Sequence, residues 1–242
     1  MELYQSEHYT LYARKDALVY RLTEPLAEIP FAWPTLEIDG ETVSAAPENL
    51  AVEDRRFLNG DIEQLTLRGT FGGGLALTVK ARVCAATPFV RFCFVVSAAS
   101  PVRLTKNNGE NLTYLCWPEA EGARRTEVLF SEYNQLAHGY CLRERPAFEH
   151  EDELMGPMLA EERDGYAMLA AYEHGSTVPD RFLCFARTEA GVALRAVRGN
   201  YWNRQSLDTH PLETIWFQIG AVRAARTTSP GRTARFSCPT AR

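Results

Sequence analysis

The sequence predicts an all-β fold, a large antiparallel β-sandwich with little helix. Short segments alternate apolar and polar residues with a period of two, as half-buried strands do. Glycine and proline, 16 and 13 in number, separate these segments along the chain. No window keeps a helical spacing of apolar residues for three turns. Strands of this length, punctuated in this way, are typical of a sandwich.

In the N-terminal quarter of the chain, the sequence predicts strands on both sides of a turn-rich region. Two short strands are expected between Tyr9 and Leu22, separated by the charged residues 14–16. Prolines at positions 25, 30, 34 and 47 predict many turns and little regular structure in the region that follows. The next strand is expected at Ile62–Arg68, inside the longer segment Val52–Arg68.

The clearest strand signals follow a glycine-rich segment. The segment 69–74 lacks the Lys-Ser/Thr pair of a phosphate loop, so it predicts a hairpin turn. Leu75–Val83 then alternates apolar with polar residues, and Phe89–Val96 places four apolar side chains on one face. Further strands are expected at Val102–Thr105, Leu112–Trp117, Glu127–Phe130, Leu136–Leu142, Met158–Glu161, Tyr166–Tyr172, Phe182–Arg187 and Val192–Arg198.

Composition and charge exclude several classes of function. The formal net charge of the 242-residue chain is −5, and nucleic-acid binding needs clustered basic residues. No segment approaches the ~20 apolar residues that cross a bilayer, and the N-terminus lacks a secretory signal. The six cysteines are spread singly without a CxxC pair, so we expect reduced side chains in a cytoplasmic protein without disulfides or zinc.

The segment from Tyr172 to Gly220 carries the strongest indication of a ligand site. Loops around two predicted strands combine aromatic, amide, carboxylate and imidazole groups, which suit the rings and hydroxyl groups of sugars. The candidate ligand-binding residues are Tyr201, Trp202, Asn203, His174 and Asp180. The alternative is that Trp202 and Trp216 pack in the core or at a sheet edge while the polar groups cap turns.

No reaction centre is evident from the residues. Glycoside hydrolysis needs two carboxylates across a cleft, and the spacing of the candidates selects no pair among Glu173, Asp180, Asp208 and Glu213. There is no GxSxG motif, and His138 and His174 lie near strand ends, where histidine more often bonds the backbone. The acidic segment 149–153 is typical of a solvated loop rather than a metal site. We therefore predict no catalytic residue, no metal and no cofactor.

With these residues set out, the chain resembles the N-terminal β-sandwich of α-galactosidase-like enzymes of glycoside hydrolase family 36. The resemblance covers about residues 1–222 and is strongest from residue 128 onward. The segments that carry it are Phe130–Gln135, Met155–Met158, Ala171–Ser176 with Pro179-Asp180, Gly199–Trp202 and Glu213–Gly220. These segments are short stretches of similar sequence, and they do not form a catalytic motif.

The resemblance implies a supersandwich domain that precedes a catalytic (β/α)8 barrel and itself holds no catalytic aspartate. It implies that the sandwich packs on the barrel, supports a homo-oligomer and helps to shape a galactoside pocket. The barrel has no counterpart in this chain, so we expect two parts, a sandwich over residues 1–222 and a basic tail over residues 223–242. From Ala221 the composition is too poor in large apolar residues to order itself, as in a basic binding tail or in a truncated or frame-shifted end.

Two other functions remain open at this point. The first is a stand-alone carbohydrate-binding module, which would expose a row of Trp and Tyr side chains. The second is a sugar enzyme of the aldose-epimerase kind. It would need His138 or His174 to meet a carboxylate such as Glu213 in one concave pocket.

Overall fold

The computed structural model describes residues 1–71, 74–105, 112–130, 142–154, 156–173, 183–196 and 206–224. Within these ranges the fold is all-β, with two large antiparallel sheets packed together, which confirms the predicted fold class. The described part contains no helix with the length and hydrophobicity of a membrane span.

Over the described residues, each sheet contains ten strands. The strands of the first sheet are β1 (Glu2–Gln5), β2 (Tyr9–Ala13), β3 (Ala17–Leu22), β4 (Ala27–Ala32), β5 (Thr35–Ile38), β6 (Glu41–Ser44), β11 (Leu112–Trp117), β14 (Glu153–Leu154), β17 (Leu183–Thr188) and β18 (Gly191–Ala196). The strands of the second sheet are β7 (Glu48–Asn59), β8 (Ile62–Phe71), β9 (Leu75–Cys84), β10 (Phe89–Ala98), β12 (Arg124–Phe130), β13 (Leu142–Pro146), β15 (Met158–Arg163), β16 (Tyr166–Tyr172), β19 (Leu212–Glu213) and β20 (Phe217–Arg223).

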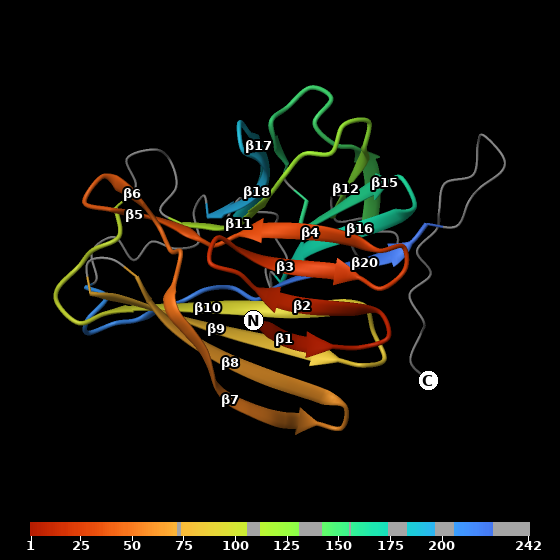
Figure 1. Cartoon of the computed structure of the whole chain (residues 1–242). Coiled ribbons are helices and arrows are strands. Elements are labelled where there is room, and N and C mark those ends of the chain that lie inside the picture. The colour runs from red at the N-terminus through yellow and green to blue at the C-terminus, as the bar shows by residue number, and fades with distance from the viewer. Residues whose placement is uncertain are drawn as a thin grey trace, which may run out of the picture.

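Segments far apart in the chain lie next to one another in both sheets. The main path of the first sheet is β1-β2-β3-β4-β11-β18-β17-β14, with β5 and β6 attached to β11. The second sheet runs β13-β12-β15-β16-β20-β10-β9-β8-β7, and β19 pairs with β10. Strand β7 therefore forms one border of the second sheet, and Figure 1 shows it at the lower edge of the molecule.

The core lies between the sheets and follows the predicted alternation. Every second residue of β9 is buried, and the predicted inner face of β10 is buried at all four positions. Phe217 of β20 connects the two sheets, because its ring lies 5.3 Å from Phe94 of the second sheet and 5.5 Å from Tyr114 of the first, between centroids. Such aromatic pairs add to the stabilisation from burial alone.

A second link between the sheets involves two stacked tyrosines of the first sheet. The rings of Tyr9 and Tyr20 lie 4.6 Å apart, and the Tyr20 hydroxyl donates to the Pro88 carbonyl oxygen of the facing layer at 2.7 Å. Burial raises the pKa of both tyrosines well above the ordinary value, because the interior disfavours a phenolate. Both side chains thus remain neutral and act as packing groups.

The prediction of a turn-rich, irregular region at 25–47 was wrong. Strands β4, β5 and β6 occupy most of it. Proline 30 lies inside β4, opposite Val19. It is tolerated because β4 pairs with its other neighbour, β11, at the single position Ala32–Cys116. Strand β7 was also missed, since its residues are almost all exposed and lack an apolar alternation.

Other boundaries differ from the predictions by smaller amounts. At Val102–Thr105 the structure has isolated bridges at Arg103 and Leu104 instead of a strand. Strand β20 continues through Ala221–Arg223, paired with β16, so the chain remains ordered beyond the predicted break at Ala221. The antiparallel pairing of Phe71 with Leu75 agrees with the predicted hairpin. Residues 136–141 and 225–242 lie outside the described residues.

Candidate functional site

The described ends of the predicted sugar-binding loops lie together at one end of the sandwich. The Tyr172 hydroxyl donates to the Leu183 carbonyl oxygen at 3.1 Å, and Leu183 pairs with Ala196. The Glu173 amide donates to the Trp216 carbonyl oxygen at 2.7 Å. Residues that precede or follow three separate loops are therefore neighbours. We call this region, defined by Tyr172, Glu173, Leu183, Ala196 and Trp216, the loop end.

The five predicted ligand-binding residues belong to the segments that join at the loop end. His174 and Asp180 follow Glu173, and Tyr201, Trp202 and Asn203 follow Ala196. All five lie outside the described residues, as does His138. Their assignment as sugar ligands stays a prediction, and so does the convergence that an aldose-epimerase site would need.

Trp216, the described tryptophan at this end, has its ring covered by arginine side chains. The guanidinium carbon of Arg82 lies 4.0 Å from the ring centroid, and that of Arg91 lies 5.5 Å away. Arg91 also forms a bidentate ion pair with Glu173. Cation–π contacts and bidentate pairing fix the indole and the carboxylate in place. We call these four residues the Trp216 cluster, a polar patch on the outer face of the second sheet.

A carboxylate and a thiol lie beside this cluster. Lys80 and Glu213 form an ion pair at 3.1 Å, and the Cys93 sulfur lies 3.4 Å from the Thr214 carbonyl oxygen. Burial raises the pKa of the Cys93 thiol to about 11, and a hydrogen bond with Thr214 offsets part of this rise. A thiol of this kind is protonated at neutral pH and unsuited to nucleophilic attack.

Two of the candidate carboxylates, Glu173 and Glu213, are each paired with a basic side chain. Glu173 is held by Arg91, and Glu213 is held by Lys80. Within the described residues, Asp208 has one buried carboxylate oxygen without a hydrogen-bond partner. Asp180 lies outside them. In the described part of the chain, no group of three or more His, Cys, Asp or Glu side chains has the arrangement of a metal site. The described Cys84, Cys93 and Cys116 are free thiols.

At the other end of the sandwich, alternating charges connect the two sheets. The Arg187 guanidinium of β17 lies 3.1 Å from the Glu119 carboxylate, which also binds Arg125 of β12 at 2.7 Å. Arg125 pairs at 2.7 Å with Glu161 of β15, which also accepts a hydrogen bond from Arg163. We call these five residues the inter-sheet ion chain. Glu161 is fully buried, and the Arg125 side chain is 7% exposed.

A second buried carboxylate lies next to this chain. Glu127 of β12 is fully buried and accepts hydrogen bonds from the Arg145 side chain and from the Gly156 amide. Gly156 has no room for a side chain, because a Cβ there would lie 2.4 Å from the Val128 carbonyl oxygen. The glycine thus allows the backbone to approach the carboxylate and replace part of its lost hydration.

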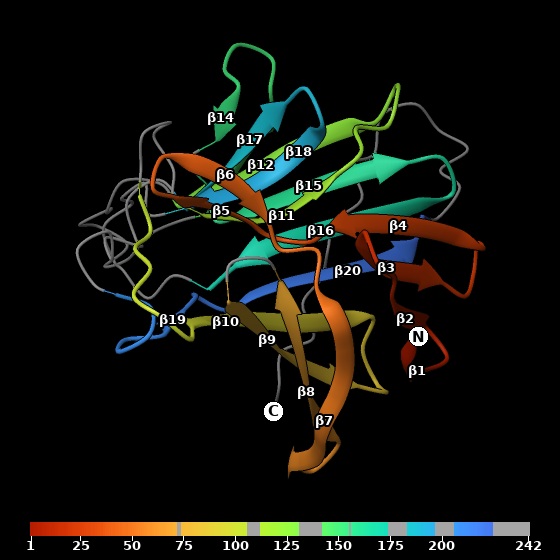
Figure 2. The same cartoon turned by 60° about the vertical axis from the view of Figure 1, so that its left-hand side comes forward.

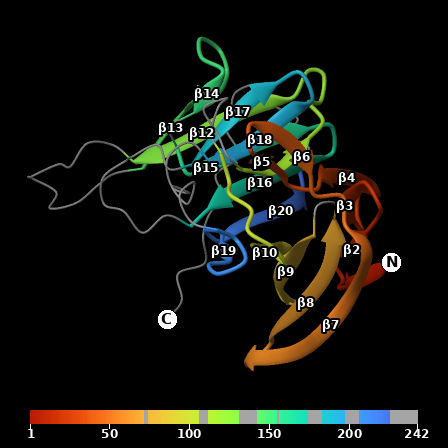
Figure 3. The same ribbon diagram turned by 90° about the vertical axis from the view of Figure 1, so that its left-hand side faces the viewer.

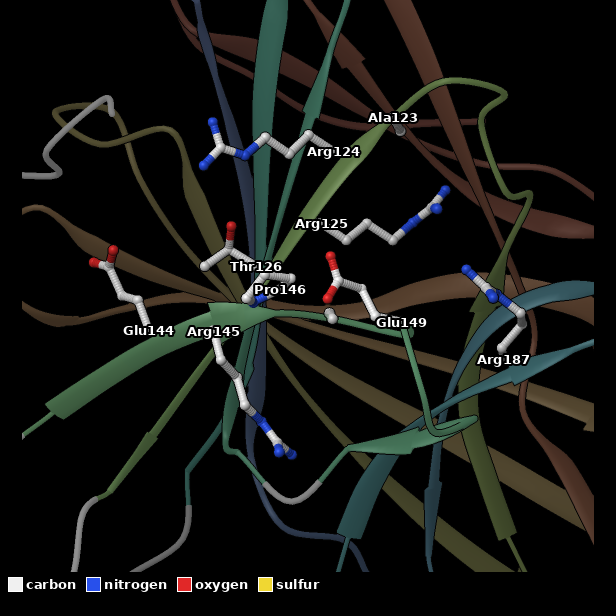
Figure 4. Close-up of a pocket in the computed structure, with 10 residues that line it drawn as sticks. Ala123, Arg124, Arg125, Thr126, Glu144, Arg145, Pro146, Glu149 and Arg187 are labelled. Atoms are coloured by element: carbon white, nitrogen blue, oxygen red, sulfur yellow. The ribbon is translucent and has the colours of Figure 1, made fainter. Parts of the chain in front are cut away.

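A polar cavity of about 460 Å³ lies beside these ion pairs. Its walls come from the first residues of β12, the last residues of β13 and Arg187 (Figure 4). Arg125 and Arg187 extend toward each other there, whereas Arg145 points away from them. Both Arg125 and Arg187 are already paired with Glu119, and the described lining contains no aromatic side chain. The described residues therefore give this cavity no stacking surface for a sugar, and Arg125 and Arg187 serve the fold.

The sequence analysis missed these buried carboxylates. A usable signal was present, because Glu161 has the same alternation as the buried Leu159 in β15. The segment 149–153 was predicted to be a solvated acidic loop, and it is only partly so. Glu151 pairs with Arg145, while Glu153 opens β14 and pairs with Arg195.

Comparisons with known proteins agree on the fold. No protein-family model matches the chain, and no curated protein matches it in sequence. The structure is similar to the family 36 α-galactosidase AgaA of Geobacillus stearothermophilus, with a TM-score of 0.56, 9% identity and 92% of this chain covered. Variants of that enzyme were solved with 1-deoxygalactonojirimycin and with raffinose.

Two further similar structures have names that indicate activity on other sugars. The α-N-acetylgalactosaminidase NagBb of Bifidobacterium bifidum matches with a TM-score of 0.54, 14% identity and 93% of this chain covered. An α-mannosidase of Enterococcus faecalis matches with a TM-score of 0.55, 7% identity and 92% covered. The chain spans about 40% of the length of AgaA, 36% of NagBb and 29% of the mannosidase. The predicted resemblance to part of a family 36 enzyme is thus confirmed at the level of the fold.

Proposed function

We propose that this chain is a non-catalytic β-sandwich domain of an α-galactosidase-like glycoside hydrolase. It packs against a catalytic (β/α)8 barrel, takes part in the assembly of a homo-oligomer and helps to shape a galactoside pocket. The observation that carries the proposal is the match of 92% of the chain to only 40% of a family 36 α-galactosidase. A fold match over part of an enzyme is what a domain without the catalytic centre gives.

The described chemistry supports a role without catalysis. Glu173 and Glu213 are bound to Arg91 and Lys80, so neither is placed as a free acid or base toward a second carboxylate. We assign the loop end to the rim of the galactoside pocket, because it gathers the ends of the loops that contain the predicted sugar ligands. The covered ring of Trp216 argues against an independent binding module with exposed aromatic platforms.

We also place the protein in the cytoplasm. The described Cys84, Cys93 and Cys116 are free thiols, as is usual in a reducing compartment. Cys93 and Cys184 are buried and act as small apolar side chains.

Titration of raffinose into the purified chain tests the assignment of the pocket. The chain supplies only part of the pocket, so we expect no saturation of heat or tryptophan fluorescence below about 1 mM raffinose. Trp216→Ala is the control for the fluorescence measurement, because it removes the described tryptophan at the loop end. Saturation in the micromolar range would overturn the accessory role and identify a carbohydrate-binding module.

A further inference from the structure

Strand β7 offers a long free edge. It has 12 residues, and within the described part of the chain it pairs with β8 alone. Figures 1 and 2 show β7 and β8 at the border of the molecule, and Figure 2 shows them at the opposite end from β14 and β17. In Figure 3 the same two strands extend below the rest of the described sheets. Border strands with unpaired backbone groups are templates for another strand unless they are covered.

Apolar side chains accompany this edge. Phe57 is 72% exposed, Leu58 is 41% exposed, and Val52 is 36% exposed. These three residues are among the few large apolar side chains that the described surface exposes, and all belong to β7. Exposed apolar groups gathered on one strand mark a contact surface more often than a solvated one.

The order of charges along β7 selects a second copy of the chain as the partner. Between Val52 and Phe57 the strand reads Glu53-Asp54-Arg55-Arg56, two acids followed by two bases. Antiparallel pairing with an identical strand reverses this order. In a register centred on Arg55, Asp54 of each strand meets Arg56 of the other, and Val52 meets Leu58 of the other. An unrelated strand would have no reason to share this self-complementary order.

We propose that β7 pairs antiparallel with β7 of a second copy across a two-fold axis near Arg55, joining the two second sheets edge to edge. A two-fold axis relates residues of the same alternation, so Asp54 lies opposite Arg56 of the second copy, twice in the dimer. Arg55 lies opposite Arg55 of the second copy. Each Arg55 is held on its own subunit, where it pairs with Glu63 at 3.2 Å, which neutralises its charge, and donates to the Leu3 carbonyl oxygen at 2.7 Å.

The ion pair that Asp54 and Arg56 form within one chain does not oppose their pairing between two copies. Asp54 and Arg56 form a pair of 3.8 Å within one chain, and both side chains are more than half exposed. Exposed pairs of this length contribute little, so exchanging them for contacts between copies costs little. This inference rests on the assembly role in the proposed function and identifies β7 as the contact surface between copies.

Light scattering of the full chain over a concentration series tests the surface by charge exchange. The wild-type chain is expected to dimerise. Arg56→Asp faces Asp54 of the second copy, and Asp54→Arg faces Arg56, so each single variant should raise the dimer Kd by about tenfold or more. The double variant Asp54→Arg with Arg56→Asp restores opposite charges and should recover dimerisation. Lys15→Asp, in the exposed turn between β2 and β3, is the control and should leave the Kd unchanged.

The outcomes separate this surface from the wider proposal. Loss of the dimer in both single variants with recovery in the double variant establishes the β7 pairing. A wild-type dimer that is insensitive to both single variants overturns the β7 surface but leaves an assembly role. A wild-type monomer at high concentration overturns both the surface and the assembly role. Circular dichroism of each variant confirms that the sheets remain folded.

Discussion

Replacement of Glu161 by glutamine is expected to lower the free energy of unfolding by about 3–5 kcal/mol. The carboxylate is fully buried and binds both Arg125 and Arg163, and the Arg125 side chain is itself buried. Removing the charge leaves the buried Arg125 guanidinium with Glu119 as its remaining counterion and leaves Arg163 without the Glu161 carboxylate. Urea unfolding with linear extrapolation measures the loss.

A control variant and a double variant accompany Glu161→Gln. Glu162 is the next residue and points to the other face of β15, so Glu162→Gln is expected to change stability by less than about 0.5 kcal/mol. Replacing both Arg125 and Glu161 by methionine removes the pair together and should recover part of the loss, because a buried pair is often replaceable by apolar groups. An unchanged unfolding midpoint for Glu161→Gln would show that the inter-sheet ion chain is not a structural link.

Phe217→Ala is expected to cost about 3–5 kcal/mol, the range for removing a buried aromatic side chain. The Phe217 ring is 1% exposed and contacts Phe92, Phe94 and Tyr114, so its removal leaves a cavity where the two sheets meet. The rigid strands on both sides limit the collapse of this cavity.

The same urea titration measures this loss. Leu26→Ala, at an apolar residue that is 78% exposed, is the control and should change stability by less than about 0.5 kcal/mol. A Phe217→Ala variant as stable as this control would contradict the placement of Phe217 at the centre of the core.

The regular strands were predictable because one of their faces is buried. Leu75–Val83 and Phe89–Val96 lie in the middle of the second sheet, where one face meets the core and the other carries polar groups. Their side chains therefore alternate in the sequence. Strand β7 has no such alternation, since nearly all of its residues face solvent, and it was missed for that reason.

The prolines misled the prediction of β4 for a different reason. A proline excludes a central strand only where both edges of the strand are paired. Strand β4 is paired along β3 but meets β11 at one position, which the sequence does not reveal.

The ligand site in the segment 172–220 stays a prediction. The structure shows that the described ends of its loops lie together at the loop end. Which arginine binds which carboxylate depends on the pairing of distant strands. Arg91 and Glu173 are 82 positions apart, so no local pattern gives their contact.

The non-catalytic role is tested by hydrolysis of a chromogenic α-galactoside by the purified chain, with mass spectrometry confirming that it ends at Arg242. A non-catalytic domain gives no turnover above the blank from a preparation with a folded, β-rich circular dichroism spectrum. Turnover proportional to the protein concentration, and lost in Asp180→Asn or Glu213→Gln, would show that this sandwich holds its own reaction centre. That result would contradict the central claim that the domain is non-catalytic.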